Sequence, residues 1–143
     1  MIYYYGNYIP RDINKSIYYY TLAAEKNSVL AQLDLGIIYY ENRYIHRNIS
    51  KSIHYLTLAA NQNSSRAQFI LGLIYYEGKY IRQDVQKGIH FLNIAAIRNE
   101  SEAQYYIGLV YFEGKYVKQD INKAVYYLSC AGNKNFQQAQ FIL

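Results

Sequence analysis

The sequence predicts an all-α protein built from antiparallel helix pairs, and three observations support this fold class. The dipeptide Ala-Gln returns every 36 residues, beginning at positions 31, 67, 103 and 139. Within each copy, apolar residues recur at the three- and four-residue spacing of one helix face. No segment of useful length alternates apolar and polar residues, which is the pattern of a half-buried strand. A single helix pair cannot bury its apolar faces alone, so neighbouring copies are expected to pack together.

The first helix of each copy, helix A, is predicted from about residue 28 to residue 40 and at the same places in later copies. Ala31, Leu35 and Ile38 lie on one face of this segment. Gly78 and Gly114 are predicted to end the helix, because a left-handed backbone costs glycine little. Two later copies open with the spacing of a capping box, Ser65 with Gln68 and Ser101 with Gln104.

The second helix, helix B, is predicted to begin after residues that are favoured as N-caps: Asp12, Asn48, Asp84 and Asp120. Its apolar face contains Ile53, Leu56 and Ala60. An asparagine, the non-glycine residue best suited to a left-handed backbone, follows each copy of this helix: Asn27, Asn63, Asn99 and Asn135. Glycines inside helix A predict a close approach between helices: Gly36, Gly72 and Gly108.

Two charged columns oppose the helix macrodipole. The acidic column lies near the end of helix A, at Glu41, Glu77 and Glu113. The basic column lies in the first turn of helix B, at Lys15, Lys51, Lys87 and Lys123. Because both placements are unfavourable alone, we predict Glu–Lys contacts that compensate them.

These patterns together resemble the Sel-one-like repeat, a short relative of the tetratricopeptide repeat. In this chain the repeat pattern reads AQFILGLIYYEGKYIRQDVQKGIHFLNIAA. The resemblance covers essentially the whole chain. Tyrosine replaces the second loop glycine of the family, and asparagine replaces the glycine between copies. The resemblance implies a right-handed α/α superhelix, a tetratricopeptide-like solenoid, that serves as a non-catalytic adaptor or scaffold in multiprotein complexes.

The whole chain, 1–143, is predicted to be a single repeat array. It divides into a partial copy at 1–27, complete copies at 28–63, 64–99 and 100–135, and a partial copy at 136–143. Repeat arrays normally end in polar capping elements, whereas Phe141, Ile142 and Leu143 are apolar. We therefore expect a piece of a longer array, with self-association through uncapped ends as a further expectation.

Composition excludes several classes of protein. A low charged fraction of 17% and an apolar fraction of 52% argue against intrinsic disorder. The single Cys130 excludes an intramolecular disulfide, and its apolar column predicts a buried, inert thiol. No apolar run is long enough to cross a membrane, and the first residues lack the features of a signal peptide, which favours an intracellular location.

No cofactor, metal or catalytic residue is predicted. His54 and His90 share one repeat column, but no acidic or thiol column lies beside them to complete a metal shell. No phosphate-binding glycine loop and no nucleophile–base arrangement occurs, so the chain is not predicted to be an enzyme.

The predicted function is recognition of a protein or peptide partner on a concave helix A surface. Positions that must pack stay constant between copies, whereas positions that face a ligand are free to vary. The most variable position of helix A holds Asp34, Ile70 and Tyr106, which are therefore the candidate binding residues.

A basic loop edge offers the alternative. The net charge is +5, and loop cations recur beside the loop tyrosines. They are Arg43, Lys79, Arg82, Lys115 and Lys118. This edge has the chemistry to meet nucleic acid or an anionic membrane surface, although its charge density is low, so these are the less favoured partners.

Overall fold

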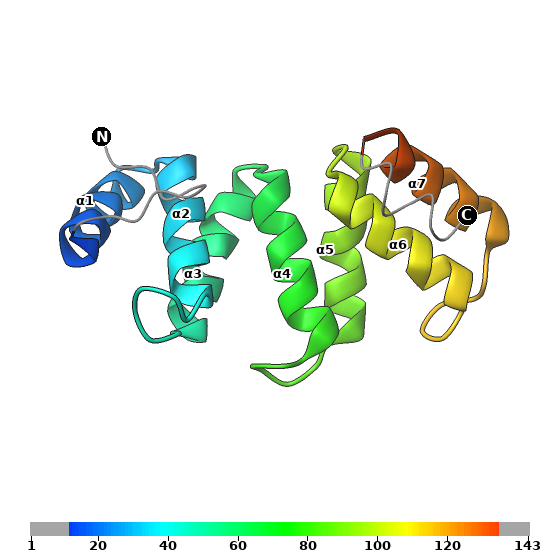
Figure 1. The fold of residues 1–143 in the computed structure, drawn as a ribbon, viewed down its shortest axis with the longest axis horizontal. Helices are drawn as coiled ribbons and strands as arrows, with labels where there is room; N and C mark the ends of the chain where they lie inside the picture. The colour runs from blue at the N-terminus through cyan, green and yellow to red at the C-terminus, as the bar shows by residue number, and fades with distance from the viewer. Residues whose placement is uncertain (1–11, 135–143) are drawn as a thin grey trace. The chain divides into compact units, whose positions relative to one another are not determined.

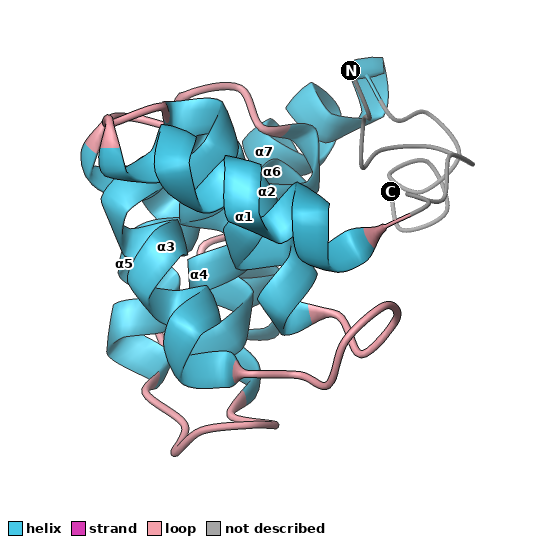
Figure 2. Cartoon of the chain, turned by 90° about the vertical axis from the view of Figure 1, so that its left-hand side faces the viewer, coloured by secondary structure: helices cyan, strands magenta, loops and turns pink. Residues whose placement is uncertain are grey.

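The computed structural model describes residues 12–134, and every regular element among them is an α-helix (Figures 1 and 2). The helices are α1 (Ile13–Glu25), α2 (Val29–Tyr40), α3 (Ile49–Asn61), α4 (Ser65–Glu77), α5 (Val85–Ile97), α6 (Ser101–Glu113) and α7 (Ile121–Lys134). Helices α2, α4 and α6 correspond to helix A, and α1, α3, α5 and α7 to helix B. Their first residues step regularly by one repeat, so the predicted all-α repeat is confirmed. None of the described helices is long and apolar enough to span a bilayer.

The chain forms two compact units, Met1–Ala67 and Gln68–Leu143. In the first unit, α2 packs against both α1 and α3, and Ala24, Ala31 and Leu35 form a buried cluster. In the second unit, α6 packs against both α5 and α7. Its core gathers side chains from α4, α5 and α6: Phe69, Ile89, Leu92, Ala95, Ala96, Ala103, Ile107 and Val110. Helix A therefore contributes to the core on both of its sides, which explains why it is apolar nearly all round.

The predicted N-caps of helix B are confirmed. In each copy the cap side chain accepts a hydrogen bond from the backbone N–H three residues later, which satisfies one donor that the helix leaves unpaired. The donor–acceptor distances are 3.1 Å at Asp12, Asn48 and Asp84, and 3.0 Å at Asp120.

The predicted capping boxes of helix A are wrong, because the cap lies one residue earlier. The hydroxyl of Ser28 accepts from the N–H of Ala31 at 3.2 Å, and that of Ser64 accepts from Ala67 at 3.2 Å. Glu100 occupies this place in the third copy and makes no side-chain cap bond. Ser65 and Ser101 are the first helical residues instead.

Two glutamines of the Ala-Gln pairs, Gln32 and Gln104, have a different role from the predicted one. Instead of reaching back to the cap, Gln32 donates through Nε2 to the carbonyl of Ala24 at 3.2 Å. Gln104 donates to the carbonyl of Ala96, also at 3.2 Å. The glutamine therefore joins the start of helix A to the end of the preceding helix B, which explains its strict spacing.

Helix ends follow the predicted backbone chemistry. Gly78 and Gly114 have φ values of 62° and 65°, and the asparagines between copies have φ values of 73°, 70° and 68° at positions 27, 63 and 99. Asn135 lies outside the described residues. In the first complete copy Asn42 stands where the others have glycine, and α2 ends at Tyr40, one residue sooner in the repeat than α4 and α6.

The predicted close approach of helices is confirmed at the helix A glycines. A Cβ on Gly36 would lie 2.5 Å from Leu56 of α3, and one on Gly108 would lie 2.7 Å from Leu128 of α7. Beside this contact, the hydroxyl of Ser52 donates to the carbonyl of Gly36 at 2.6 Å. Each leucine is almost completely buried, so glycine is what allows the two helices of a pair to touch.

The predicted Glu–Lys contacts are wrong. Across residues 12–134, no carboxylate of the acidic column pairs with a lysine of the basic column within 4.0 Å. Three of these lysines lie over tyrosine rings of helix A instead, with Nζ to ring-centroid distances of 5.2 Å for Lys51, 4.6 Å for Lys87 and 5.1 Å for Lys123. The negative face of the ring attracts the ammonium, so a π system rather than a carboxylate stabilises the lysine in its unfavourable helix position.

Candidate protein-binding surfaces

The variable position of helix A is less exposed than its variation predicts. Asp34 in α2 is only 9% exposed, and Ile70 in α4 and Tyr106 in α6 are half-buried. Ile70 and Tyr106 pack against the core of the second compact unit. None of these three side chains is therefore fully exposed, and Asp34 is the least exposed of them. The change of residue at this position between copies therefore alters the packing between neighbouring helices as well as the exposed surface.

Tyr106 keeps one part of its ring accessible while neighbouring rings hold the other part. The ring centroid of Phe69 in α4 lies 5.9 Å away, and that of Tyr105 lies 5.8 Å away in an edge-to-face arrangement. Burial, followed by the nearby charges of Glu77 and Glu102, raises the pKa of the Tyr106 phenol. The ring is therefore ordered before any partner arrives.

The basic loop edge carries cations that are held over aromatic rings. In each loop a cation lies over the ring of the next residue: Arg43 over Tyr44 at 5.1 Å, Lys79 over Tyr80 at 5.3 Å, and Lys115 over Tyr116 at 5.1 Å. Arg82 and Lys118 follow three residues later and are exposed. The structure thus repeats the same cationic pattern in successive loops.

Two hydrogen bonds hold each loop of the second compact unit between its flanking helices. Gln83 donates through Nε2 to the carbonyl of Tyr76 at 2.8 Å, and the N–H of Asp84 donates to the carbonyl of Tyr75 at 2.9 Å. Gln119 and Asp120 repeat this pattern, with distances of 2.8 Å and 3.0 Å to the carbonyls of Phe112 and Tyr111. The loops are therefore fixed in one conformation that recurs with the repeat.

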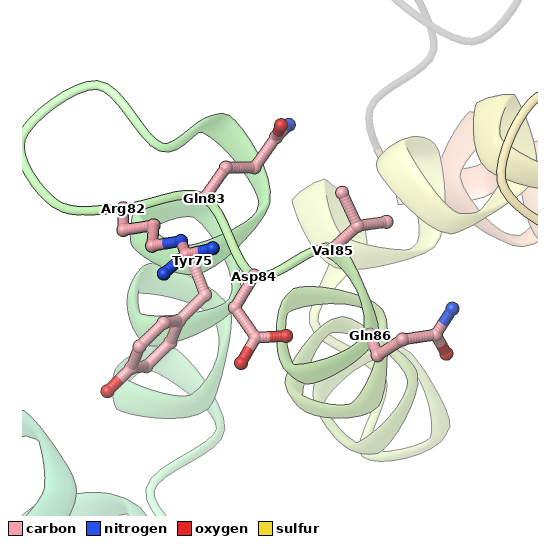
Figure 3. A pocket seen from close by; sticks show the side chains of 6 residues that line it. All are labelled: Tyr75, Arg82, Gln83, Asp84, Val85 and Gln86. Atoms are coloured by element: carbon pink, nitrogen blue, oxygen red, sulfur yellow. The ribbon is translucent and has the colours of Figure 1, made fainter.

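A hollow opens beside each of these loops. The first, of about 520 Å³, is lined by Tyr75, Arg82, Gln83, Asp84, Val85 and Gln86. Figure 3 shows Tyr75, Arg82 and Asp84 grouped on one side of the loop, with Gln83 and Gln86 extending away from them. The second, of about 370 Å³, is lined by Tyr111, Val117, Lys118, Gln119, Asp120 and Lys123. Four of the lining positions are the same in the two copies, so the hollow is a property of the repeat.

A column of exposed rings on helix B is absent from the predicted binding residues. Tyr18 and Tyr126 are 60% and 62% exposed, and His54 and His90 are exposed at the same repeat position. Each ring contacts the ring of the next residue edge-to-face, at centroid distances of 5.0 Å to 5.5 Å. The sequence signal is the doublet of ring-bearing residues that recurs in every copy of helix B.

The remaining chemistry-bearing residues form no site. Among residues 12–134, no three His, Cys, Asp or Glu side chains group closely enough to hold a metal ion. Cys130 is half-buried rather than buried, because its repeat column is half-buried at Leu58 and Ile94 as well.

The repeating helix pair is that of a known protein family. The family model of the Sel1 repeat matches four segments of this chain, residues 1–28, 29–64, 65–99 and 101–136. The chain belongs to the Sel1 repeat family. Proteins of this family are generally non-catalytic repeat modules that mediate protein–protein interactions. Among curated proteins, no sequence matches this chain.

Solved Sel1 repeat structures share the fold. A Sel1 repeat protein from Oxalobacter formigenes is 30% identical with a TM-score of 0.86, over 94% of this chain and 39% of that one. A protective antigen of uropathogenic Escherichia coli with an SLR fold is 27% identical with a TM-score of 0.81, over 87% of this chain and 27% of that one. This Sel1 repeat chain therefore spans well under half the length of these two relatives.

A third structure matches at nearly equal length. Helicobacter pylori cysteine rich protein B is 29% identical with a TM-score of 0.72, over 97% of this chain and 100% of that one. The Sel1 repeat chain has a single cysteine, and close contacts such as those at Gly36 and Gly108 join the helices of its pairs.

Proposed function

We propose that this Sel1 repeat chain acts as a non-catalytic adaptor that binds segments of partner proteins on its helix A surface. The observation that carries the proposal is the ordered, half-exposed ring of Tyr106, held by Phe69 and Tyr105. Tyrosine is enriched at interface hot spots because it supplies a large contact area with few rotatable bonds. A ring that neighbouring side chains already order loses little conformational freedom when a partner binds.

The other two candidate residues contribute differently to this proposal. Ile70 is half-buried in the same compact unit and supplies flanking apolar contact. Asp34 is buried in the first compact unit, beside Tyr20, whose pKa is raised first by burial and then by the charge of Asp34. We therefore assign partner contact to Tyr106 and Ile70, and assign Asp34 to the packing of α1 and α2.

Affinity capture of cellular proteins tests this proposal. The bait is the wild-type chain, compared with Tyr106→Ala, the Tyr106→Ala/Ile70→Ala double variant and Val125→Ala, which shortens an exposed helix B side chain. We expect loss of the Tyr106 ring to lower recovery of specific partners about tenfold, as for a hot-spot residue, and Val125→Ala to leave it unchanged. Circular dichroism identifies variants that do not fold, and Tyr106→Phe keeps the ring if alanine disrupts packing. Unchanged recovery with folded Tyr106→Ala and the double variant would defeat the proposed site.

The alternative use of the basic loop edge, binding of nucleic acid or an anionic membrane, is less well supported. Binding of single-stranded nucleic acid commonly uses aromatic faces as platforms for bases. One face of each loop tyrosine at positions 44, 80 and 116 is already covered by the cation before it. The loop cations are therefore better suited to a partner with negative charges than to one that binds by stacking its bases.

A further inference from the structure

We propose that the two loop hollows of the second compact unit bind acidic side chains from one segment of a partner protein. The hollows include Tyr75 and Tyr111 of helix A but neither Ile70 nor Tyr106, so the inference goes beyond the function proposed above. The first hollow is the one lined by Arg82, and the second is the one lined by Lys118 and Lys123. The occupant of each hollow is an aspartate or glutamate carboxylate.

The cations at these hollows have no carboxylate partner in the described part of the chain. Lys79, Arg82 and Lys87 at the first loop form no ion pair within 4.0 Å, and the same holds at the second loop for Lys115, Lys118 and Lys123. Four of the six are placed by tyrosine rings rather than by opposite charges. A cation over a ring keeps its charge, so it remains available to a carboxylate.

The aspartate in each hollow opposes this charge only in part. Asp84 and Asp120 each accept a backbone N–H in the first turn of helix B, at 3.1 Å and 3.0 Å. The partial positive charge of the helix N-terminus offsets part of the aspartate charge. The lining charges are Arg82 against Asp84 in the first hollow, and Lys118 and Lys123 against Asp120 in the second. Glu77 and Glu113, at the ends of α4 and α6, line neither hollow. With the aspartate charge partly offset, each lining attracts an anion.

The rigidity of the loops lowers the cost of binding. Each loop is held to the end of helix A through both a side-chain amide and a backbone N–H, so its cations are positioned before the partner arrives. The hollows occupy equivalent places in neighbouring repeats, and adjacent packed helices lie about 8–10 Å apart. An extended segment advances about 3.3 Å per residue, so acidic residues about three positions apart would reach both hollows.

A protein segment suits the geometry better than nucleic acid does. Tyr75 is stacked on Phe91 at 6.3 Å and lies under Lys87, and Tyr111 is stacked on Tyr127 at 6.5 Å and lies under Lys123. Rings that already contact both an aromatic ring and a lysine are poor platforms for a base. Separate hollows also match discrete carboxylates better than a continuous phosphate backbone.

Titration of the full chain with a labelled synthetic peptide tests the inference. The peptide carries Glu at every third position and Ser elsewhere, and the control peptide carries Gln in place of Glu. We expect the Glu peptide to bind about tenfold more tightly than the Gln peptide at low salt. The Arg82→Ala/Lys118→Ala variant is expected to lose about tenfold in affinity. Lys26→Ala/Arg98→Ala removes equal charge from exposed positions at the turns between copies and is expected to leave affinity unchanged within about twofold.

A charge swap adds a gain of binding to the test. Arg82→Glu/Lys118→Glu is expected to reject the Glu peptide and to bind a peptide with Lys at the same positions. Equal binding of Glu and Gln peptides, or equal loss in both alanine variants, would overturn the proposal. Tighter binding of single-stranded RNA or anionic vesicles than of the Glu peptide, weakened by Arg82→Ala/Lys118→Ala, would also overturn it. Tyr106→Ala is expected to keep full affinity for the Glu peptide, so failure here is distinct from failure of the helix A proposal.

Discussion

The smallest residues of this chain determine how closely its helices pack. Gly36, Gly72 and Gly108 each meet a buried leucine of the partner helix at a distance that admits no additional carbon. Glycine inside a helix costs roughly 1 kcal/mol relative to alanine. A cost repeated in three copies indicates that the close approach stabilises the pair by more than glycine destabilises the helix.

Filling this contact provides the first test of that view. We expect Gly36→Val to lower the free energy of unfolding by about 2–3 kcal/mol, because the added Cβ and its two methyl groups would have to displace Leu56 from its buried position. Denaturant unfolding measures the change. Ser50→Val, at an exposed position of α3, is the control and should change stability by less than about 0.5 kcal/mol. A Gly36→Val protein as stable as the control would show that the helices separate without cost.

Individual helices show how far sequence reasoning reaches. Asp12 and Asn48 as caps, and Asn27 and Asn63 as left-handed residues, are correctly predicted because their backbone chemistry is local. The start of helix A is misplaced by one residue because serine occurs at both Ser64 and Ser65, and both satisfy the same local rule. Comparison with Ser28 one repeat earlier would have distinguished them.

Contacts between helices are harder to predict than the positions at which helices begin and end. The lysines of helix B meet rings rather than carboxylates, and charge patterning alone does not reveal which group lies nearest in space. The variable residues of helix A face neighbouring helices, because a repeat protein must also pack copy against copy. Variation between copies therefore identifies a binding surface only after burial is known. The basic loop residues recur at equivalent positions because loops of equal length repeat them, but the hollows beside them require coordinates.

A polar network between turns provides a test at the scale of elements. Gln62, which follows α3, donates through Nε2 to the side-chain oxygen of Gln32 at 2.9 Å and to the backbone carbonyl of Asn27 at 3.1 Å. Gln32 is almost completely buried, so loss of its partner leaves an acceptor without a hydrogen bond.

We expect Gln62→Ala to lower the free energy of unfolding by about 1–3 kcal/mol. The Gln32→Ala/Gln62→Ala double variant should lose less than the sum of the single variants, because both remove the same interaction. Strict additivity in denaturant unfolding would contradict a direct coupling between the two turns. Asn61→Ala, at an exposed position one residue away, serves as the control for a general effect on the turn.

At the scale of the whole molecule, the abundant tyrosines contribute to the stability of the fold. Twenty of the 143 residues are tyrosine, and many stack between helices of a pair, as Tyr39 does on Tyr55 at 6.1 Å. Burial, with smaller effects from nearby groups, raises the phenol pKa of four of them: Tyr20, Tyr76, Tyr106 and Tyr127. The folded state therefore favours the neutral, protonated form of each of these four phenols.

This raised pKa predicts a loss of stability at alkaline pH. Below about pH 10 the phenols are protonated in both states, and their contribution to folding is fully present. As the pH rises above that value, the unfolded chain releases these protons before the folded chain does. The free energy of unfolding therefore falls as the pH approaches the raised pKa of the folded chain. We expect the fall between about pH 9 and pH 11 to be smaller in Tyr106→Phe than in the wild type. Equal slopes in the two proteins, measured by denaturant unfolding across this range, would show that Tyr106 ionises as freely in the folded chain as in the unfolded one.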